Sequence, residues 1–268
     1  MIRHCSKVIR SEIRAGRIAG PTSGLAAGYV QASAVILPAA AAEDFARFCA
    51  ANPAACPLLY RSEPGQFALP PAGDDIDVRR DLPRYRLHRD GGDTEVTDIA
   101  DHWRDDLVTF LLGCSFSLEE ALISNGLQVR NVWQGKNIPM FRTSSSCTPA
   151  GPFGANLVVS MRPFSAGQLD LVRSICARYP LLHGAPVAAG EPAQLGIADL
   201  QAPDFGEAVA VREGEVPVFW SCAVTAGDAL RGANLDFFAT NSPGHMLVTD
   251  RLARELENIA AGSEPPWL

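Results

Sequence analysis

Leu107-Val108-Thr109-Phe110-Leu111-Leu112 is an almost uninterrupted apolar run with the length of a buried β-strand. Ser117 follows it, and Glu120 comes three residues later, a spacing that is typical of the first turn of a helix. The run therefore predicts a core strand that leads directly into a helix. A second strand is predicted over Leu157–Met161, before a helix over Gln168–Arg178.

The rest of the chain continues this alternation of strands and helices. A strand that ends at Leu37 precedes a helix over Ala40–Asn52, and Val216–Trp220 precedes a helix that begins after Thr225. The turn Asp90-Gly91-Gly92-Asp93 predicts a hairpin. Together these patterns predict an α/β protein with layered mixed sheets and helices, and an α+β fold is the alternative.

Length and composition indicate a globular protein. The 268 residues are 47% hydrophobic and 20% charged, which is enough for a sizeable core. We predict a single catalytic domain over residues 1–268. The alternative is a division into two subdomains that contain related strand–helix units near 107–143 and 216–249.

The charge balance favours a small molecule as the partner. There are 23 Lys and Arg residues against 30 Asp and Glu, a formal net charge of −7, and no basic run that would follow a phosphate backbone. We expect a small carboxylate or amino-acid substrate and no nucleic acid. The N-terminal segment lacks the apolar core of a secretory signal, and no stretch approaches the roughly 18 apolar residues of a membrane span. We therefore expect a cytoplasmic protein that does not bind membranes, and a homo-oligomer stays open.

The cysteines and histidines are scattered along the chain. The seven cysteines form no C-x-x-C pair, and the five histidines show no H-E-x-x-H spacing. There is no dinucleotide or P-loop fingerprint either. We predict reduced thiols, no metal site and no cofactor.

The two strand–helix segments match each other. Each has a cysteine after the strand, then a hydroxyl residue and an acidic residue at three-residue steps: Cys114, Ser117 and Glu120 in the first, Cys222, Thr225 and Asp228 in the second. Downstream, Met140–Thr143 corresponds to Met246–Thr249. The match predicts two pseudo-repeated halves that derive from one ancestral unit.

Both cysteines precede a predicted helix start. Such a start carries partial positive charge and free N–H groups, so it binds carboxylates and lowers the pKa of a nearby thiol. Cys114 and Cys222 are therefore catalytic candidates, with Ser115 as a substrate-binding neighbour. Two helix starts brought together by pseudo-symmetry could hold a dicarboxylic amino acid. The alternative is that both cysteines are small buried residues at a strand–helix junction.

Five further residues are candidates for the site. Arg142, with Thr143 beside it, precedes a polar loop, where a guanidinium could hold a carboxylate through two parallel bonds. His245 follows Ser242-Pro243-Gly244 and could act as acid or base near neutral pH. A structural ion pair and a hydrogen-bonded loop histidine are the respective alternatives.

His183 and Arg104 are the remaining substrate-binding candidates. His183 lies in His183-Gly184-Ala185-Pro186, and Arg104 lies just before the strand that starts at Leu107. A hydrogen-bonded loop histidine and an ion-paired strand entrance are the alternatives.

Short motifs in one order run along almost the whole chain. The first group comprises Gly20-Pro21-Thr22-Ser23-Gly24, Gly28-Tyr29-Val30-Gln31-Ala32, Cys56-Pro57-Leu58-Leu59 and Trp103-Arg104-Asp105-Asp106. The second comprises Gly113-Cys114-Ser115-Phe116-Ser117, Pro139-Met140-Phe141-Arg142-Thr143, Val158-Val159-Ser160-Met161-Arg162-Pro163, Val216-Pro217-Val218-Phe219-Trp220 and Pro243-Gly244-His245-Met246. In these motifs the sequence resembles the D-glutamate cyclase family, which comprises bacterial hydro-lyases.

The resemblance implies a cofactor-independent carbon–oxygen lyase that dehydrates D-glutamate to 5-oxo-D-proline. In this reaction the α-amino group attacks the side-chain carboxyl carbon and water leaves, which requires a grip on the α-carboxylate, a base and an acid. We assign the grip to Arg142 and the two helix starts, the acid or base to His245, and an auxiliary role to Cys114 or Cys222.

The sequence departs from the family pattern at three positions. The family usually has histidine where Asn131, Ala188 and Asn241 stand here. The alternatives are therefore a hydro-lyase that acts on another small amino or hydroxy acid, or a relative that binds carboxylates without turnover.

Overall fold

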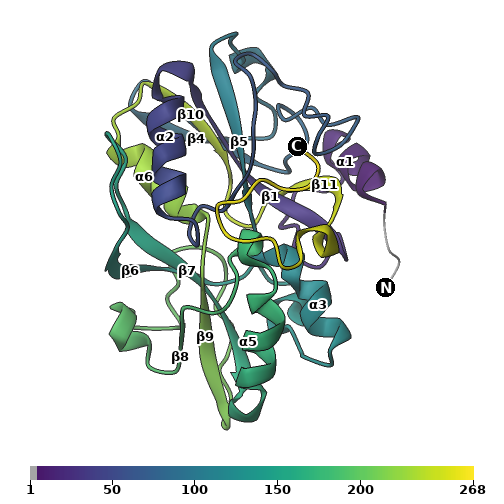
Figure 1. Ribbon diagram of the computed structural model, residues 1–268, viewed down its shortest axis with the longest axis vertical. Helices are drawn as coiled ribbons and strands as arrows, with labels where there is room; N and C mark the ends of the chain where they lie inside the picture. The colour runs from purple at the N-terminus through teal and green to yellow at the C-terminus, as the bar shows by residue number, and fades with distance from the viewer. Residues whose placement is uncertain (1–4) are drawn as a thin grey trace.

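Two β-sheets with helices packed against them make up the chain (Figure 1). The computed structural model describes residues 5–268, so the first four residues of the N-terminal segment lie outside it. The larger sheet has the strand order β2-β5-β1-β10-β3-β4, with β11 also paired to β1, and the smaller has the order β6-β7-β9-β8. The expected combination of sheets and helices is confirmed. Every strand pair in residues 5–268 is antiparallel, which is nearer to the α+β alternative.

The bounds of the elements follow the sequence patterns closely. The strands are β1 (Tyr29–Pro38), β2 (Leu58–Arg61), β3 (Tyr85–Arg89), β4 (Gly92–Val96), β5 (Leu107–Gly113), β6 (Met140–Ser146), β7 (Asn156–Ser165), β8 (Ala188–Ala189), β9 (Glu215–Ser221), β10 (Phe237–Asn241) and β11 (Leu247–Leu252). The α-helices are α1 (Ser6–Arg14), α2 (Ala39–Ala51), α3 (Glu119–Ser124), α4 (Arg130–Gln134), α5 (Leu169–Ala177) and α6 (Val224–Gly232). The predicted hairpin is confirmed as β3 and β4, and the predicted helix over Ala40–Asn52 as α2.

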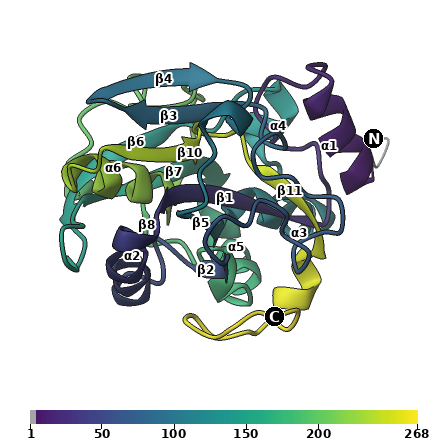
Figure 2. The same cartoon turned by 90° about the horizontal axis from the view of Figure 1, so that it is seen from above.

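β1 is the central strand of the larger sheet. It pairs with β5 on one side, and with β10 and then β11 on the other. Figure 2 shows the strands in order from β4 at one edge to β2 at the other. One face of the sheet is covered by α2 and α6. Phe45 of α2 packs edge-on to Phe110 of β5, with ring centroids 4.9 Å apart. β1 is buried from Val30 to Leu37, and apart from Gln31 and Ser33 its residues in this range are apolar, as in a strand covered on both faces.

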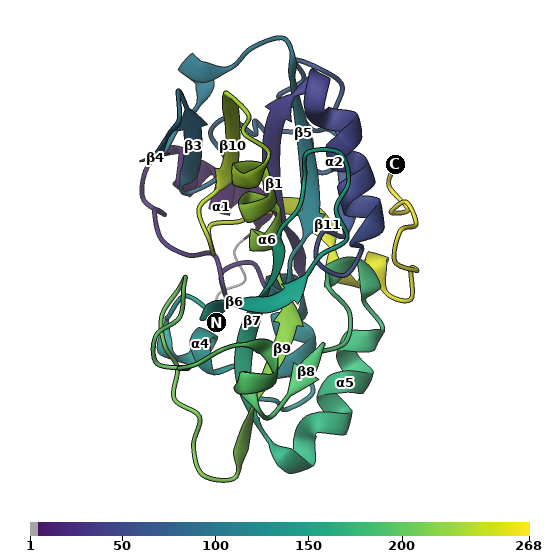
Figure 3. The ribbon, with the colours of Figure 1, turned by 90° about the vertical axis from the view of Figure 1, so that its left-hand side faces the viewer.

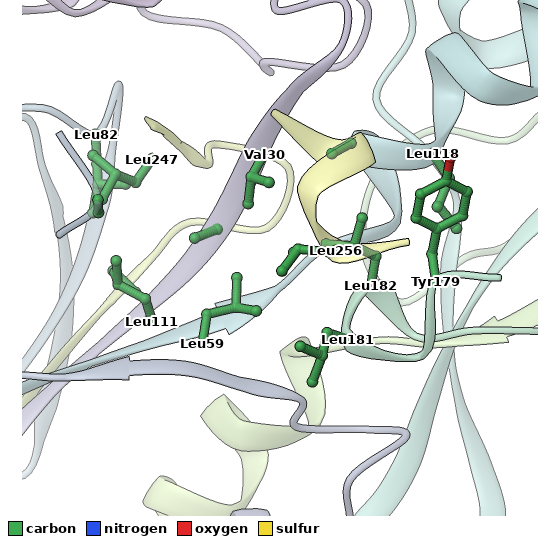
Figure 4. Close-up of a cluster of buried hydrophobic side chains, with 14 of the residues drawn as sticks. Val30, Leu59, Leu82, Leu111, Leu118, Tyr179, Leu181, Leu182, Leu247 and Leu256 are labelled. Atoms are coloured by element: carbon green, nitrogen blue, oxygen red, sulfur yellow. The ribbon is translucent and has the colours of Figure 1, made fainter. Parts of the chain in front are cut away.

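The opposite face of the larger sheet forms the main hydrophobic core. Leu111 and Leu247 from the sheet pack there with Leu82, and with Leu181 and Leu182 from the segment after α5 (Figure 4). Burial of each such leucine contributes about 1.5–3 kcal/mol. The core therefore joins the sheet to α3, α5 and the C-terminal segment.

The smaller sheet lies beyond one end of the larger sheet (Figure 3). Its central strand, β7, places Ser160 between Met140 of β6 and Trp220 of β9 in direct register, so these three side chains share one face. On the other face, Phe141 and Phe219 pack under residues 195–211.

The two matching segments of the sequence lie in different sheets. β5 flanks β1 in the larger sheet, whereas β9 flanks β7 in the smaller one. The strand downstream of each segment lies in the opposite sheet. β6, which follows β5 in the chain, pairs with β7 in the smaller sheet, and β11, which follows β9, pairs with β1 in the larger one. Each sheet thus contains a strand from the other half, and the shared ancestry of the halves stays a prediction.

Candidate functional site

The ends of β5 and β9 meet between the two sheets. Cys114 and Cys222, the first residues after these strands, share an apolar cluster with Phe116, Val158 and Met246. The Cys114 sulfur accepts a hydrogen bond from the Phe116 N–H at 3.5 Å, and the Cys222 N–H donates to the Val158 carbonyl at 3.0 Å. The structure therefore places the two candidate cysteines together, each at the start of a helix.

The predicted capping of these helices by Ser117 and Thr225 is wrong. The Ser117 hydroxyl instead accepts from the Gln31 N–H at 2.9 Å and donates to the Gln31 carbonyl at 3.2 Å. The Thr225 hydroxyl accepts from the Val158 N–H at 2.9 Å and donates to the Cys222 carbonyl at 2.7 Å. Backbone groups beside the strand ends need partners once they are buried, and the hydroxyls supply them.

The prediction that the helix starts lower the thiol pKa values is also wrong. Burial raises the pKa of Cys114 well above its ordinary value, and it raises that of Cys222 to about 11. The N–H groups of Phe116 and Val224 oppose this effect but do not outweigh it. Both cysteines are therefore neutral thiols at pH 7, able to donate a hydrogen bond but poor as nucleophiles.

A buried ion pair lies behind the two cysteines. The Arg162 guanidinium is 3.4 Å from the Glu119 carboxylate, and the two side chains are 1% and 4% exposed. Arg162 also donates to the Ser115 hydroxyl at 3.2 Å. Glu119 in turn accepts from the Ser23 hydroxyl at 2.8 Å and the Gly24 N–H at 2.9 Å. The candidate Ser115 is thus held by the ion pair.

Several buried polar atoms around this ion pair have no partner in residues 5–268. They include Oε1 of Gln31, Oδ1 of Asn131, Oγ of Ser160 and Nε of Arg162. Burial raises the pKa of Glu119, and the charge of Arg162 opposes that shift. Sequence reasoning missed Glu119 and Arg162 as functional residues. The only signal was a charged residue in the otherwise apolar strand around Arg162.

His183 is a neutral, hydrogen-bonded histidine beside the same centre. Its side chain is buried, and Nδ1 donates to the Ala54 carbonyl at 2.7 Å. Burial lowers the pKa of His183 to about 4, the Arg162 charge adds to this shift, and the Ala54 hydrogen bond opposes it. This geometry matches the alternative of a loop histidine satisfied by the backbone.

We expect His183 to make the stability of the protein depend on pH. Its pKa is lower in the folded chain than in the unfolded one, so protons bind preferentially to the unfolded state between pH 6.5 and about 4. The free energy of unfolding should fall by on the order of 3 kcal/mol as the pH decreases through this window. Denaturant titrations at several pH values measure it.

The matched variant is His183→Asn, which keeps a donor for Ala54 and tolerates the positive φ of 77° at this position. We expect it to flatten the dependence between pH 6.5 and 4. An equally steep curve in the variant would show that other groups cause the loss of stability.

His245 lies in the loop between β10 and β11 and is half-buried. Its Nδ1 donates to the Pro243 carbonyl at 3.1 Å, which leaves Nε2 as the acceptor of the neutral ring. Burial lowers the pKa of His245 below its ordinary value, and the nearby Glu95 carboxylate opposes that shift. The side chain is therefore neutral at pH 7 and suited to accept a proton.

Arg142 is occupied by two carboxylates. It donates to Asp228 at 2.7 and 2.9 Å and to Asp204 at 3.2 Å, and its side chain is 47% exposed. The neighbouring Thr143 hydroxyl donates to the Leu157 carbonyl at 2.8 Å. The structure thus gives Arg142 the ion pairs of the alternative interpretation, and they tie β6 to α6.

Arg104 does not reach the site. It pairs with Asp106 at 2.9 Å at the start of β5, whereas Cys114 follows the end of that strand, roughly 20 Å away at about 3.4 Å per residue. Its surroundings are those of the predicted ion-paired strand entrance.

Arg86 of β3 is a cation that sequence reasoning did not single out. It is partly buried and lines a small recess with Ser33, Asn241 and the start of α6. Only the alternation of polar and apolar residues in Tyr85-Arg86-Leu87 could have indicated that Arg86 points to one face of a sheet. Its distance in sequence from α6 hid its position beside the start of that helix.

The predicted site residues lie outside the cavity of about 510 Å³, and they form no metal-binding cluster within residues 5–268. This cavity lies elsewhere, beside Tyr29, Ser124 and Tyr179. Within residues 5–268, no group of three or more His, Cys, Asp or Glu side chains is arranged to hold a metal ion. Nor does any helix in this part of the chain have the length and apolar character needed to cross a membrane.

Comparison with known proteins identifies the family. A family model described as D-glutamate cyclase matches residues 108–250. A Bordetella petrii protein is 57% identical over 91% of this chain and 92% of its own length, and one from a Jannaschia species is 54% identical over 90% and 91%. Both relatives carry the name "Putative hydro-lyase". The chain belongs to the D-glutamate cyclase family, as its motifs predicted.

Among solved structures, a nitrogen repressor-like protein from Methanococcus jannaschii aligns with a TM-score of 0.39 and 9% identity. The alignment covers 91% of this chain and 98% of that one. A TM-score at this level does not establish a common fold.

Proposed function

We propose that the protein is a hydro-lyase that converts D-glutamate to 5-oxo-D-proline and water. The observation that carries this proposal is the 57% identity to a relative that bears the name "Putative hydro-lyase", which extends over 91% of the chain and so includes both sheets. The family model, described as D-glutamate cyclase, supports the choice of D-glutamate as substrate.

The chemistry needs one base and one acid. The α-amino nitrogen forms a bond to the side-chain carboxyl carbon, and the bond from that carbon to one oxygen breaks. We assign the proton of the amine to the neutral His245, whose Nε2 is free to accept it. The two protons that the ammonium group gives up pass through His245 to the departing oxygen, which leaves as water. The neutral thiols of Cys114 and Cys222 hydrogen-bond that oxygen as it departs. Neither thiol acts as a nucleophile, because burial keeps both protonated.

In this proposal Arg142 is a positioning residue and does not contact the substrate. Because Asp228 occupies its guanidinium, Arg142 holds α6 against β6 and so fixes the start of that helix next to Cys222. Ser115 is placed by the buried Arg162, and His183 by the Ala54 carbonyl. Thr143 is likewise engaged with the backbone of β7 and supports β6.

A direct assay tests the function. Purified protein is incubated separately with D-glutamate, L-glutamate and 5-oxo-D-proline, and interconversion is followed by chiral chromatography. We expect conversion of the D-forms alone. Conversion of another small amino or hydroxy acid, with D-glutamate untouched, would assign the site to a different hydro-lyase. Binding of D-glutamate without product would favour the non-catalytic relative.

A further inference from the structure

A recess opens between the larger sheet and the start of α6. Thr240 of β10 pairs in register with Val35 of β1 on one side and with Arg86 of β3 on the other, so all three side chains lie on the same face. Ala223 and Val224, at the start of α6, line the recess from above this face. Its volume is about 20 Å³.

Arg86 enters this recess without a carboxylate partner in residues 5–268. Its guanidinium carbon lies 5.4 Å from the centroid of the Phe205 ring. An arginine remains charged in a protein, and a partly buried guanidinium without an anion is costly. A partly buried arginine without an ion pair therefore indicates a position reserved for an anionic ligand.

The carboxylates near Arg86 are all bound to other arginines. Glu95 lies directly across the hairpin but pairs with Arg84 at 2.6 Å. Asp93 pairs with Arg231 at 2.9 Å, and Asp228 with Arg142 at 2.7 Å. Arg231 also lines the recess and is itself held by Asp93, so Arg86 is the arginine of this lining that has no carboxylate partner within residues 5–268.

The polar side chains beside Arg86 are fixed or unsatisfied. Asn241 is 6% exposed, and its Oδ1 accepts from the Ser33 hydroxyl at 2.8 Å and the Ala34 N–H at 3.0 Å. Thr240 is 8% exposed, and its hydroxyl has no partner in the described part of the chain. A polar side chain that is buried to this extent, lines the recess and leaves its hydroxyl without a hydrogen bond is a second indication of a polar ligand at this position.

The start of α6 adds a positive field. The helix has nine residues, and within residues 5–268 no side chain caps its first turn. Its N-terminal dipole therefore favours negative charge in the recess that Ala223 and Val224 line.

We propose that this recess binds one carboxylate group of the substrate, with Arg86 as its main ligand and the Thr240 hydroxyl as a second donor. The identity of the substrate rests on the proposed function, whereas the binding of a carboxylate does not. A volume of about 20 Å³ holds a group about the size of one water molecule. It therefore receives no more than the oxygens of the carboxylate head, and the rest of the molecule lies outside, near Pro243, which borders the recess.

Binding measured by calorimetry tests the site without requiring turnover. The probes are D-glutamate and glutarate, which has the same two carboxylates but no amine. We expect Arg86→Gln to raise the dissociation constant of both probes at least about tenfold, because it removes a charge-assisted pair of hydrogen bonds. Arg86→Lys keeps the charge but loses the bidentate geometry, so we expect an intermediate loss.

The matched control is Arg89→Gln. Arg89 lies on the same strand, is exposed and pairs with Asp90 outside the recess. We expect this variant to bind both probes as the unaltered protein does. Thermal unfolding of all variants shows whether they are folded, and Arg86→Lys provides the test if Arg86→Gln is not.

The outcomes separate this inference from the proposed function. Loss of glutarate binding in Arg86→Gln, in a protein that does not convert D-glutamate, supports the carboxylate site and rejects the cyclase activity. Unchanged binding and an unchanged KM in both Arg86 variants, in a protein that does convert D-glutamate, overturns the site alone. Absence of binding of either probe to the unaltered protein overturns the site as well.

Discussion

Replacing His245 by alanine should lower the turnover of D-glutamate by about 10²- to 10⁴-fold, the usual contribution of a positioned general base. Nε2 of His245 is the acceptor that takes the amine proton in the proposed reaction. Because burial lowers the pKa of His245, the ring stays unprotonated at neutral pH. The rate of the unaltered enzyme should therefore fall with decreasing pH only below about 6.5, the ordinary histidine value. Rates across pH 5–8 measure both effects.

His102→Ala is the control for this variant. His102 lies in the short 3₁₀ helix Ala100–His102, before β5 and at the far end of that strand from Cys114. It should turn over D-glutamate as the unaltered enzyme does. Ordinary turnover by His245→Ala would remove His245 from the mechanism, and a general loss in both variants would indicate damage to the fold.

Replacing Arg162 by methionine should lower the free energy of unfolding by about 3–5 kcal/mol. The substitution leaves the Glu119 carboxylate buried without its cation, and removal of one partner from a buried ion pair carries this cost. Urea titration of the single variant against the unaltered protein measures the change.

Two further variants show whether the charge causes the loss. Arg162→Met combined with Glu119→Gln removes the stranded charge, so part of the stability should return. Arg80→Met breaks the exposed pair with Asp98 and should change the free energy of unfolding by less than about 1 kcal/mol. A similarly small loss in Arg162→Met would mean that breaking the buried pair costs no more than breaking an exposed one.

Local patterns were sufficient to predict most of the elements. The apolar run from Leu107 predicted β5, the glycine turn at Asp90–Asp93 predicted the hairpin, and the helix predicted over Ala40–Asn52 is α2. These signals depend on neighbouring residues, which the sequence displays directly. The antiparallel pairing and the exchange of β6 and β11 between sheets depend on contacts between distant segments, so no local pattern contains them.

The site was only partly predictable for the same reason. The junctions at Cys114 and Cys222 were found because a repeated motif marked both. Their thiol pKa values were predicted in the wrong direction, because the helix starts are visible in the sequence and the extent of burial is not. Arg162 and Glu119 lie 43 residues apart, and their pairing has no sequence signature.

The order in which strands join β1 has a consequence for synthesis of the protein on the ribosome. Val35 of β1 pairs with Phe110 of β5 on one side, but on the other side with Thr240 of β10. One edge of β1 therefore remains without its partners until almost the whole chain has been translated. An apolar strand with an open edge is a template for pairing with other chains. A nascent chain stalled before residue 237 should thus depend on chaperones that shield strand edges, and release of the finished chain should end that dependence.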